Sequence, residues 1–371
     1  MTETVGLAFV GLEFGRQVLR TLLSGPEGGR FRLIAVCDID PEKVAAVSRD
    51  YGVAGYTTFD PLLADPAIHA VGLFTGPAGR ANLVRRIIRA GKDVVTTKPF
   101  EVDPDAARCV LEEASAVGRV VLLNSPQPEL PASLQQIERW RRDYSLGRPI
   151  SCRAEILISS REKADGRWLD DPNLCPVAPI FRLGIYAIND LVRLFGRVRA
   201  VQVLANRIFT ERPTPDNAQL ALLFENGAIG SIGANFCVEN GQHYAHSLWL
   251  NFERGSITRN AHPVAYGEAD TSSRLQLTTV SAGREVVIRE WQAPEITGAY
   301  PWGVFHDAIA KRRISPGLVD VIVHGIEIIA AMTCAERSGA TEPVHRVGDS
   351  GGALPPSGRE DGAGRKTGAG S

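Results

Sequence analysis

The stretch Val94-Val95-Thr96-Thr97-Lys98-Pro99-Phe100 is a short apolar run that stops at a lysine followed by a proline. β-Branched residues in so short a run indicate a buried β-strand, which the proline ends. Open α/β sheets bind their ligands at the carboxyl ends of their strands. The sequence therefore predicts that Lys98 lies at the ligand-binding edge of a parallel sheet.

An apolar run, a glycine turn and a helix begin the chain. The run covers residues 5–10 and the helix is predicted to extend to about Ser24, which is the order of a nucleotide-binding unit. Glu13 stands where such turns usually carry a second glycine, and its side chain restricts the approach of a pyrophosphate. A turn without a cofactor is the alternative interpretation. The residues predicted to border a cofactor here are Gly11, Glu13, Phe14 and Gly15.

An acidic residue follows the second predicted strand, which covers residues 32–37. This residue, Asp38, has the spacing from the glycine turn expected of the acid that binds a ribose 2′-hydroxyl. Because a carboxylate at this place repels a 2′-phosphate, NAD is favoured over NADP as the cofactor.

The same alternation of strands and helices continues to about residue 125. An apolar strand at 70–74 leads to a turn that begins with Thr75, and basic residues end the helix at 81–90. Thr75 and Pro99 follow neighbouring strands, so both are predicted to border the cofactor. Further elements are predicted at 104–117 and 120–123. The fold class predicted for residues 1–125 is a Rossmann-like α/β domain with a parallel sheet.

The pattern of predicted elements changes in residues 126–345. Strand-like runs are joined by turn signals, which predicts an α+β domain with an open, mostly antiparallel sheet. These runs lie at 149–159, 198–209, 217–225, 228–237, 246–253 and 274–290, with turns at Asn226-Gly227, Arg254-Gly255 and Ala282-Gly283. Helices are predicted at 180–195, 301–312 and 317–338. Residues 346–371 are rich in Gly, Ser and Pro, and we expect a disordered tail.

Composition excludes several classes of partner. Lys and Arg number 41 against 42 Asp and Glu, and no basic run is present, so nucleic acid is not expected. The chain has no apolar run of about 20 residues and no signal peptide, which predicts a cytoplasmic protein without a membrane segment. The six cysteines show no metal-ligand spacing, so we expect buried thiols and no metal.

Lys98 has two interpretations. It is either a solvated lysine before a proline or a partly buried lysine beside the cofactor, whose lowered pKa lets it relay the proton of a substrate hydroxyl. The glycine turn and Asp38 favour the second interpretation.

Together these motifs resemble the Gfo/Idh/MocA family of oxidoreductases over about residues 5–340. The matching segments are the Gly11–Gly15 turn, Asp38-Ile39-Asp40-Pro41, Gly91-Lys92-Asp93-Val94-Val95 before Lys98-Pro99, and Gly184-Ile185-Tyr186-Ala187-Ile188-Asn189. The resemblance implies an NAD(P)-dependent oxidoreductase that acts on a small sugar-like molecule. It also implies a homodimer or homotetramer, because open sheets of this family commonly pair between subunits.

Family members carry Asp-x-Gly-x-His-x-x-Asp on the helix that faces the nicotinamide, and this chain departs from that pattern. Here the residues are Arg182, Tyr186 and Asn189. By resemblance to the glucose-fructose oxidoreductase branch, Tyr186 transfers the proton, with its pKa lowered by Lys98. Arg182 cannot accept a proton; it either binds an anionic group of the substrate or pairs with an acid such as Asp190 or Glu129.

Asn189 completes this pattern, and Trp168 lies in a segment that resembles the family's loop over the substrate. Both are therefore predicted to bind substrate, although packing at a domain interface is the alternative role for Trp168. The leading hypothesis is hydride transfer between nicotinamide and a carbinol or carbonyl carbon of a sugar-like or anionic metabolite. The alternatives are a redox-silent binding protein or catalyst of a non-redox step, favoured by Glu13 and Arg182, and an imine reductase in a biosynthetic route.

Overall fold

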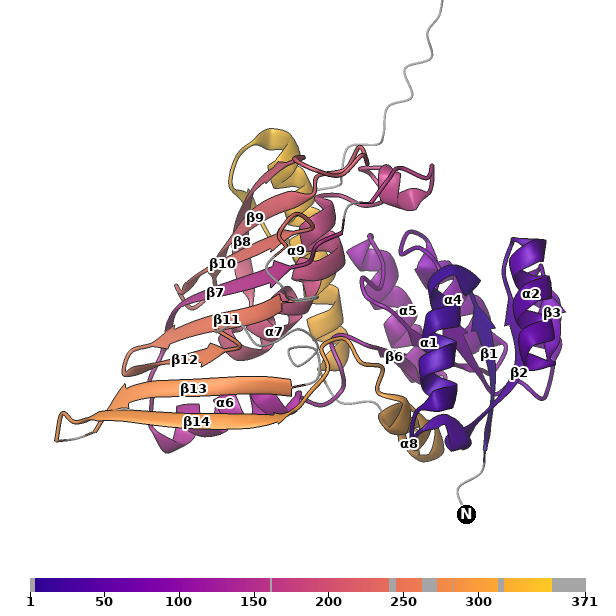
Figure 1. Cartoon of the computed structure of the whole chain (residues 1–371), viewed down its shortest axis with the longest axis horizontal. Coiled ribbons are helices and arrows are strands. Elements are labelled where there is room, and N and C mark those ends of the chain that lie inside the picture. The colour runs from indigo at the N-terminus through magenta and orange to yellow at the C-terminus, as the bar shows by residue number, and fades with distance from the viewer. Residues whose placement is uncertain are drawn as a thin grey trace, which may run out of the picture.

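The structure is a computed structural model that describes residues 4–160, 162–239, 245–261, 272–281, 283–312 and 317–348. Within these residues the chain forms two sheets, each with its own helices, that lie next to each other (Figure 1). The predicted tail falls almost entirely in residues 349–371, outside the described residues, as does Ala282 of one predicted turn.

The first sheet has six parallel strands in the order β3-β2-β1-β4-β5-β6. The strand order reverses beside β1, which is the switch point where this kind of sheet binds ligands. The predicted Rossmann-like sheet is confirmed. Its strands are β1 (Val5–Val10), β2 (Phe31–Cys37), β3 (Ala54–Tyr56), β4 (Ala70–Leu73), β5 (Asp93–Thr96) and β6 (Val121–Leu123).

Two helices of this domain, α2 and α5, begin at a local sequence signal. Asp40 accepts hydrogen bonds from the amides of Glu42 and Lys43, and Asp103 caps a later helix in the same way; a proline follows each cap. The helices are α1 (Leu12–Ser24), α2 (Pro41–Tyr51), α3 (Phe59–Ala64), α4 (Arg80–Arg89) and α5 (Pro104–Ala116), with a 3₁₀ turn at Gly28–Arg30.

The second sheet has nine strands in the order β14-β13-β12-β11-β7-β10-β9-β8-β15. Only the β7–β10 pair among these is parallel, so the prediction of a mostly antiparallel sheet is confirmed. The strands are β7 (Pro149–Leu157), β8 (Val198–Asn206), β9 (Asn217–Phe224), β10 (Ile229–Asn235), β11 (Ala245–Phe252), β12 (Gly255–Arg259), β13 (Ser272–Val280), β14 (Val286–Pro294) and β15 (Glu342–Pro343).

Helices α7 and α9 lie between the second sheet and the first domain (Figure 1). The predicted helix at 180–195 is α7 (Ile185–Phe195), preceded by a π-helical turn at Ile180–Gly184. Such turns are frequent at functional sites. The remaining helices are α6 (Ala132–Asp143), α8 (Trp302–Lys311), α9 (Leu318–Ser338) and a 3₁₀ turn at Trp168–Asp170.

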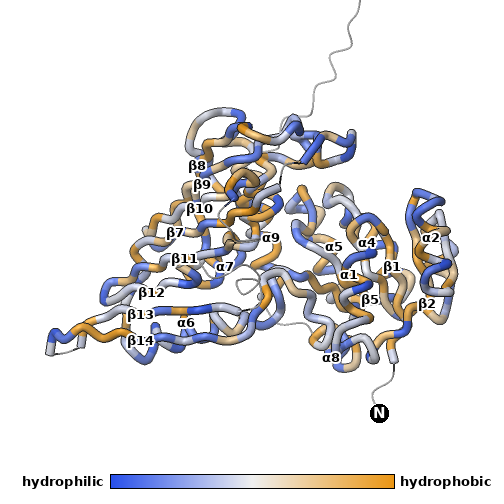
Figure 2. Tube along the Cα trace, in the orientation of Figure 1, coloured by the Kyte–Doolittle hydropathy of each residue, from blue (hydrophilic) through white to orange (hydrophobic). Residues whose placement is uncertain are grey.

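Helix α9 connects the two hydrophobic cores. Its early residues, with Trp302 and Phe305 of α8, pack in the core of the first sheet, whereas Ile328 and Met332 pack in the core of the second. Hydrophobic residues accordingly run along the strands of the first sheet and along α9 (Figure 2). The C-terminal part of the chain therefore contributes to both cores.

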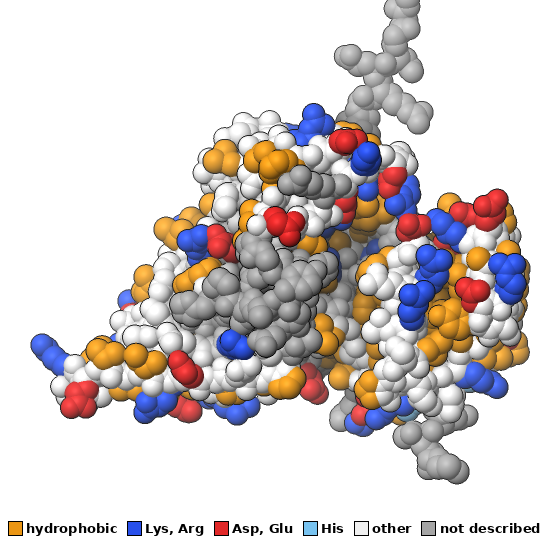
Figure 3. All heavy atoms as spheres, in the orientation of Figure 1, with side chains coloured by type: hydrophobic (Ala, Val, Ile, Leu, Met, Phe, Trp, Pro, Cys, Tyr) orange, Lys and Arg blue, Asp and Glu red, His pale blue; other side chains and the backbone are white. Residues whose placement is uncertain are grey.

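Helix α9 is also long and apolar enough to cross a membrane, with a mean hydropathy of 1.8. However, 67% of the apolar window is buried inside the protein, which is the pattern of a core helix. On the face drawn in Figure 3, cationic and acidic side chains are interspersed. That mixture provides no single-sign patch for a polyanion on this face.

Candidate active site

Lys98 follows β5 at the carboxyl edge of the first sheet, as predicted. Its Nζ donates a hydrogen bond to the carbonyl oxygen of Arg182, in the π-helical turn of the second domain. The ammonium also lies over the ring of Tyr186, 4.4 Å from the ring centroid. The lysine therefore joins the ligand edge of the first sheet to the start of α7.

Burial is the main reason that the pKa of Lys98 is lowered to about 7; the neighbouring cations Arg182 and Arg80 contribute to the decrease, and Cys175 acts in the opposite direction. The charged form of a lysine is disfavoured when its ammonium leaves water. A group whose pKa lies near neutrality can both take up and release a proton at physiological pH.

Asn124 ties Lys98 to Tyr186. Its Oδ1 accepts a hydrogen bond from the Lys98 amide at 3.0 Å, and its Nδ2 donates to the hydroxyl of Tyr186 at 3.0 Å. Nδ2 also donates to the carbonyl of Gly298 at 3.1 Å. Asn124 was not identified from the sequence, although its place directly after β6, at the same edge as Lys98, is a signal that could have found it.

The hydroxyl of Tyr186 lies against the backbone of Gly298. A Cβ at Gly298, where φ is +76°, would lie 2.5 Å from this oxygen, so only glycine allows the close approach. Burial raises the pKa of Tyr186 above that of a free tyrosine, Tyr300 adds to this effect and Asn124 opposes it. The sequence-based expectation of a lowered pKa does not hold in this geometry, because burial of the hydroxyl is the dominant effect.

Arg182 is paired with an acid that was not foreseen. Both of its terminal nitrogens donate to the carboxylate of Glu162, at 2.8 and 2.7 Å, and its guanidinium lies 4.5 Å from the ring centroid of Phe236. Neither Asp190 nor Glu129, the partners considered from the sequence, makes this pair. The bidentate edge expected to bind a substrate anion is thus already occupied.

Asn189 points into the protein. It is 3% exposed, its Nδ2 donates to Ser125 Oγ at 3.0 Å, and its Oδ1 lies close to Gly325 of α9. Asn189 thereby holds α7 against the segment that carries Asn124.

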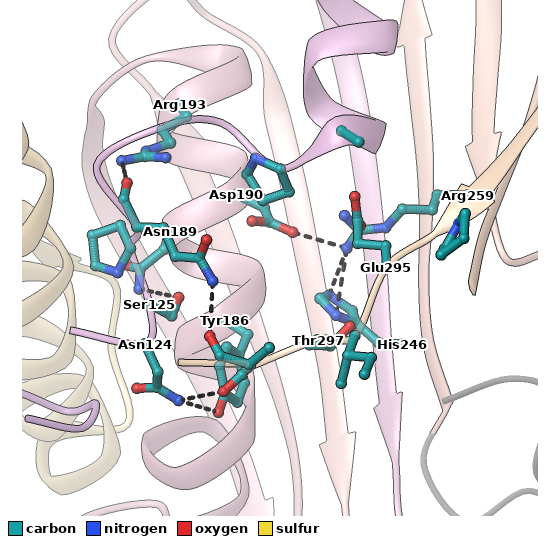
Figure 4. Close-up of a pocket in the computed structure, with 18 residues that line it drawn as sticks. Asn124, Ser125, Tyr186, Asn189, Asp190, Arg193, His246, Arg259, Glu295 and Thr297 are labelled. Carbon is teal, nitrogen blue, oxygen red and sulfur yellow. Dashed lines mark hydrogen bonds and ion pairs between the residues drawn. The ribbon is translucent and has the colours of Figure 1, made fainter. Parts of the chain in front are cut away.

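A cavity of about 290 Å³ extends from Tyr186 along α7 (Figure 4). One turn beyond Tyr186, Asp190 accepts a 2.8 Å hydrogen bond from Arg259, whose guanidinium also contacts His246. Burial and Arg259 lower the pKa of His246 well below its usual value, so the ring is neutral. The other walls are segment 124–132 and loop 294–299.

The remaining charges of the cavity are also partnered. Glu295 accepts from the amide and hydroxyl of Ser133 at 2.8 and 2.7 Å, and from Ser273 at 2.8 Å. Arg193 donates to the carbonyls of Gln127 and Glu129. Two guanidiniums and two carboxylates therefore balance one another in the wall, which suits a neutral ligand with hydroxyl groups.

Arg80 holds the loop that presents Lys98. The side chain is 1% exposed and donates to four carbonyl oxygens, those of Thr75, Thr97, Pro99 and Phe100. Burial lowers the pKa of Arg80 to about 10. Thr75 and Pro99, predicted beside the cofactor, are thus joined at the sheet edge through this one guanidinium.

The two glycines of the first turn are required by packing. At Gly11, where φ is +85°, a Cβ would lie 2.6 Å from the carbonyl oxygen of Phe74; at Gly15 it would lie 3.0 Å from the ring of the same residue. Phe14 is half exposed and packs edge-on against Phe74 at 6.2 Å between centroids. The turn therefore sits tightly on the end of β4.

The carboxylate of Glu13 is directed away from this turn. It lies 2.6 Å from Lys43 Nζ on α2 and 3.2 Å from Arg167 Nη1 in the second domain. The hydrogen bond from Lys43 is the largest effect, and it keeps the pKa of Glu13 below its usual value. The charge that argued against a bound pyrophosphate is therefore neutralised by two cations.

Asp38 lies at the carboxyl end of β2, beside the start of α1. One carboxylate oxygen accepts from the Leu12 amide at 2.6 Å and the other from the Asp40 amide at 3.0 Å. Each oxygen keeps a further lone pair for a hydroxyl donor. This position fits the predicted contact with a ribose.

The sheet edge fits an NAD molecule. The amides of Glu13 and Phe14 have no acceptor among the residues that the structure describes, as expected of a helix start that binds phosphate. The hydroxyl of Tyr300 is buried, and burial raises its pKa to about 12 although a hydrogen bond with Thr97 and the charge of Arg80 oppose the rise. Its ring packs on Phe74, 5.5 Å between centroids, so it too lies at this edge.

Trp168 lies against the first domain. Its indole is 3.4 Å from where a Cβ of Gly76, in the loop after β4, would stand. The described residues contain no group of three or more His, Cys, Asp or Glu that could hold a metal ion.

Two family models match the chain. One, described as an oxidoreductase family with an NAD-binding Rossmann fold, matches residues 5–125; the other, described as the GFO/IDH/MocA C-terminal domain, matches residues 134–258. The first match covers all six strands of the first sheet, and the second covers the part of the second sheet from β7 to β12.

The similar proteins are oxidoreductases. Oxidoreductase P35 of Formosa agariphila is 25% identical over 61% of this chain and 70% of its own length. Levoglucosan dehydrogenase of Pseudarthrobacter phenanthrenivorans is 22% identical over 67% of this chain and 71% of its own. The fold of GenD2, from gentamicin A biosynthesis and solved with NAD, matches with a TM-score of 0.71 at 20% identity, covering 93% of this chain and 98% of that one.

Proposed function

We infer the function from one premise, that the chain belongs to the Gfo/Idh/MocA family and is an NAD-binding oxidoreductase. We propose that it moves hydride between nicotinamide and a carbinol carbon of a neutral, hydroxyl-rich small molecule. The observation that carries this proposal is the position of Lys98 at the ligand edge of the NAD-binding sheet, hydrogen-bonded to the Arg182 carbonyl and over the Tyr186 ring, where burial lowers its pKa to about 7. We further propose NAD rather than NADP, because the Asp38 carboxylate would repel a 2′-phosphate.

Bound NAD supplies the hydride acceptor. In the proposed oxidation, neutral Lys98 takes the proton of the reacting hydroxyl as the C–H bond is broken. The ammonium that forms is held by the Arg182 carbonyl and by the ring of Tyr186. The hydroxyl of Tyr186, fixed by Asn124, donates to the reacting oxygen and orients it. Its raised pKa keeps this hydroxyl protonated, so it serves better as a donor than as a base.

The cavity beside Tyr186 supports a neutral substrate. Its four charges are matched within the wall, and Asp190 retains an oxygen that can accept from a substrate hydroxyl. Arg182, the residue that pointed to an anionic substrate, is occupied by Glu162. Glu13 and Arg182 favoured a redox-silent role, and both charges are compensated by ion pairs, which weakens that alternative.

Oxidation is expected to depend on pH through Lys98. Because the neutral amine is the active form, kcat/KM for oxidation should rise about tenfold per pH unit below pH 7 and level off above it. Reduction needs the ammonium and should show the reverse dependence. Initial rates at 340 nm between pH 5.5 and 9 measure this; a pH-independent rate would contradict the assignment.

Removing the hydroxyl of Tyr186 should affect catalysis more than folding. Tyr186→Phe keeps the ring under Lys98, and Asn124 retains the Gly298 carbonyl as its acceptor. We expect kcat to fall about 10- to 100-fold and the free energy of unfolding to change by about 1 kcal/mol or less. Steady-state kinetics and urea unfolding of the same preparation check both, and Tyr56→Phe serves as the control.

A substrate panel tests the proposed function itself. NAD reduction at 340 nm is followed with neutral polyols, among them myo-inositol and levoglucosan, and with carboxylated sugars of the same size. We expect turnover with a neutral compound and none with its carboxylated counterpart. Preference for the carboxylated compound would contradict a neutral substrate, and NAD reduction with neither group would contradict the proposed reaction class.

A further inference from the structure

A segment of the second domain crosses to the glycine turn of the first. This segment, residues 162–171, is called the strap here. It is folded around Arg212, which is 7% exposed by its side chain and donates to Glu162 at 2.8 Å, to Asp165 at 3.1 Å and to Asp170 at 2.6 Å. The strap is therefore an ordered element with a buried cation at its root.

The tip of the strap contacts the first domain at two places. Arg167 Nη1 lies 3.2 Å from the Glu13 carboxylate, and Trp168 packs against Gly76. Asp165 accepts from Arg167 Nε at 2.9 Å and from Nη2 at 2.5 Å, which fixes the direction of the guanidinium. The cation is thus held beside the first turn of α1.

The first turn of α1 is where this fold binds a pyrophosphate. Glu13 there would repel such an anion, but Lys43 already neutralises it, so Arg167 brings a second positive charge to the same place. A guanidinium has five N–H donors, and Asp165 and Glu13 engage only some of them. Arg167 is also nearly half exposed, so its remaining donors can reach a ligand.

We propose that Arg167 binds the pyrophosphate of NAD and that Glu13 is the positioning residue that holds Arg167 at the turn before NAD arrives. Docking of the strap and binding of NAD are then coupled, since each stabilises the other. Preorganisation of this kind lowers the cost of ordering a side chain on binding. The inference rests on NAD binding alone, and it stands or falls independently of the proton transfer assigned to Lys98.

Titration of the full-length protein with NAD by calorimetry, without substrate, tests this proposal. We expect Arg167→Ala to raise the Kd about tenfold and Glu13→Gln about threefold. In the Glu13→Gln protein, Arg167→Ala should raise the Kd only about threefold more, because the guanidinium is no longer positioned. Lys163→Ala removes an exposed cation of the same strap and should leave the Kd unchanged within about twofold.

ADP-ribose, which carries the pyrophosphate but no nicotinamide, should show the same loss in Arg167→Ala. The proposal would be overturned by an unchanged Kd in Arg167→Ala or by tighter NAD binding in Glu13→Gln. It would also be overturned if the effects of the two substitutions on the Kd were independent, or if Arg167→Ala weakened the binding of NAD but not of ADP-ribose. Thermal unfolding of the apo variants accompanies the titrations. We expect the melting temperature of each variant to lie within about 2 °C of that of the unmodified protein, because exposed ion pairs contribute little to stability.

Discussion

Lys98→Met is expected to lower kcat by a factor of about 10² to 10⁴ while leaving the affinity for NAD within about threefold. General acid–base groups contribute rate factors of this size. Methionine matches the length of the lysine stem, so the packing of the loop is kept, whereas the cation–π contact with the Tyr186 ring is lost. What is lost is a proton acceptor whose pKa burial lowers to about 7.

The same variant should be more stable than the unmodified protein at neutral and acidic pH. An unfolded lysine binds its proton below about pH 10.4, whereas folded Lys98 does so only below about pH 7. Between these values the unfolded state binds more protons, so the stability owed to Lys98 rises with pH through this window. At pH 7 and below, the penalty for a buried ammonium is present in full, and methionine removes it.

Three experiments test these expectations: stopped-flow kinetics for kcat, titration for the affinity for NAD, and thermal unfolding at pH 6 and pH 9.5 for stability. The stabilisation by methionine should be larger at pH 6 than at pH 9.5. Turnover within about threefold of the unmodified protein would remove Lys98 from the mechanism. Lys311→Met, on an exposed side chain of α8, is the matched control for loss of a lysine.

Arg80→Met is expected to destabilise the protein by roughly 3–5 kcal/mol, because four backbone carbonyls would lose a buried donor. The loop from Thr97 to Phe100 would loosen, so kcat should fall as well. Arg80→Lys keeps the charge but has only three donors on a point-like head, and it should recover only part of both losses.

Urea unfolding measures the effect of Arg80→Met on the free energy of unfolding. The control is Arg85→Met on the same helix, which breaks a partly exposed 2.8 Å pair with Glu113 and should cost about 1 kcal/mol or less. An Arg80→Met protein as stable as Arg85→Met would show that the guanidinium does not organise this loop.

Much of the fold could be predicted from the sequence because its helices and strands carry local signals. The apolar runs of β1 and β5 and the capped helix α5 begin and end within one or two residues of prediction. The short strand β3 was missed because Ala54-Gly55-Tyr56 is largely exposed and has no apolar period. Helix α6 was also missed, although its buried residues Ser133, Leu134, Ile137 and Trp140 follow helical spacing and could have been recognised.

Only part of the candidate site could be predicted from the sequence. Lys98 and Tyr186 were singled out correctly as neighbours, because a strand end and a motif each carry a local signature. The partners of Arg182 and Glu13 were not predicted, because Glu162 and Arg167 belong to an irregular segment whose path depends on the tertiary fold. The raised pKa of Tyr186 likewise follows from burial, which the sequence does not encode locally. The predicted homo-oligomer and the cytoplasmic location stay predictions.

Titration of the Lys98 side chain shows whether this lysine can accept the substrate proton near neutral pH. The protein is labelled with ¹⁵N at lysine Nζ, and the resonance missing from Lys98→Met is followed by NMR from pH 5 to 11 in the presence of NAD. We expect a titration midpoint near pH 7 for this resonance, well below the midpoints of the other lysines. A midpoint above pH 9.5 would contradict this expectation, because Lys98 would then be a charged lysine unable to take the substrate proton.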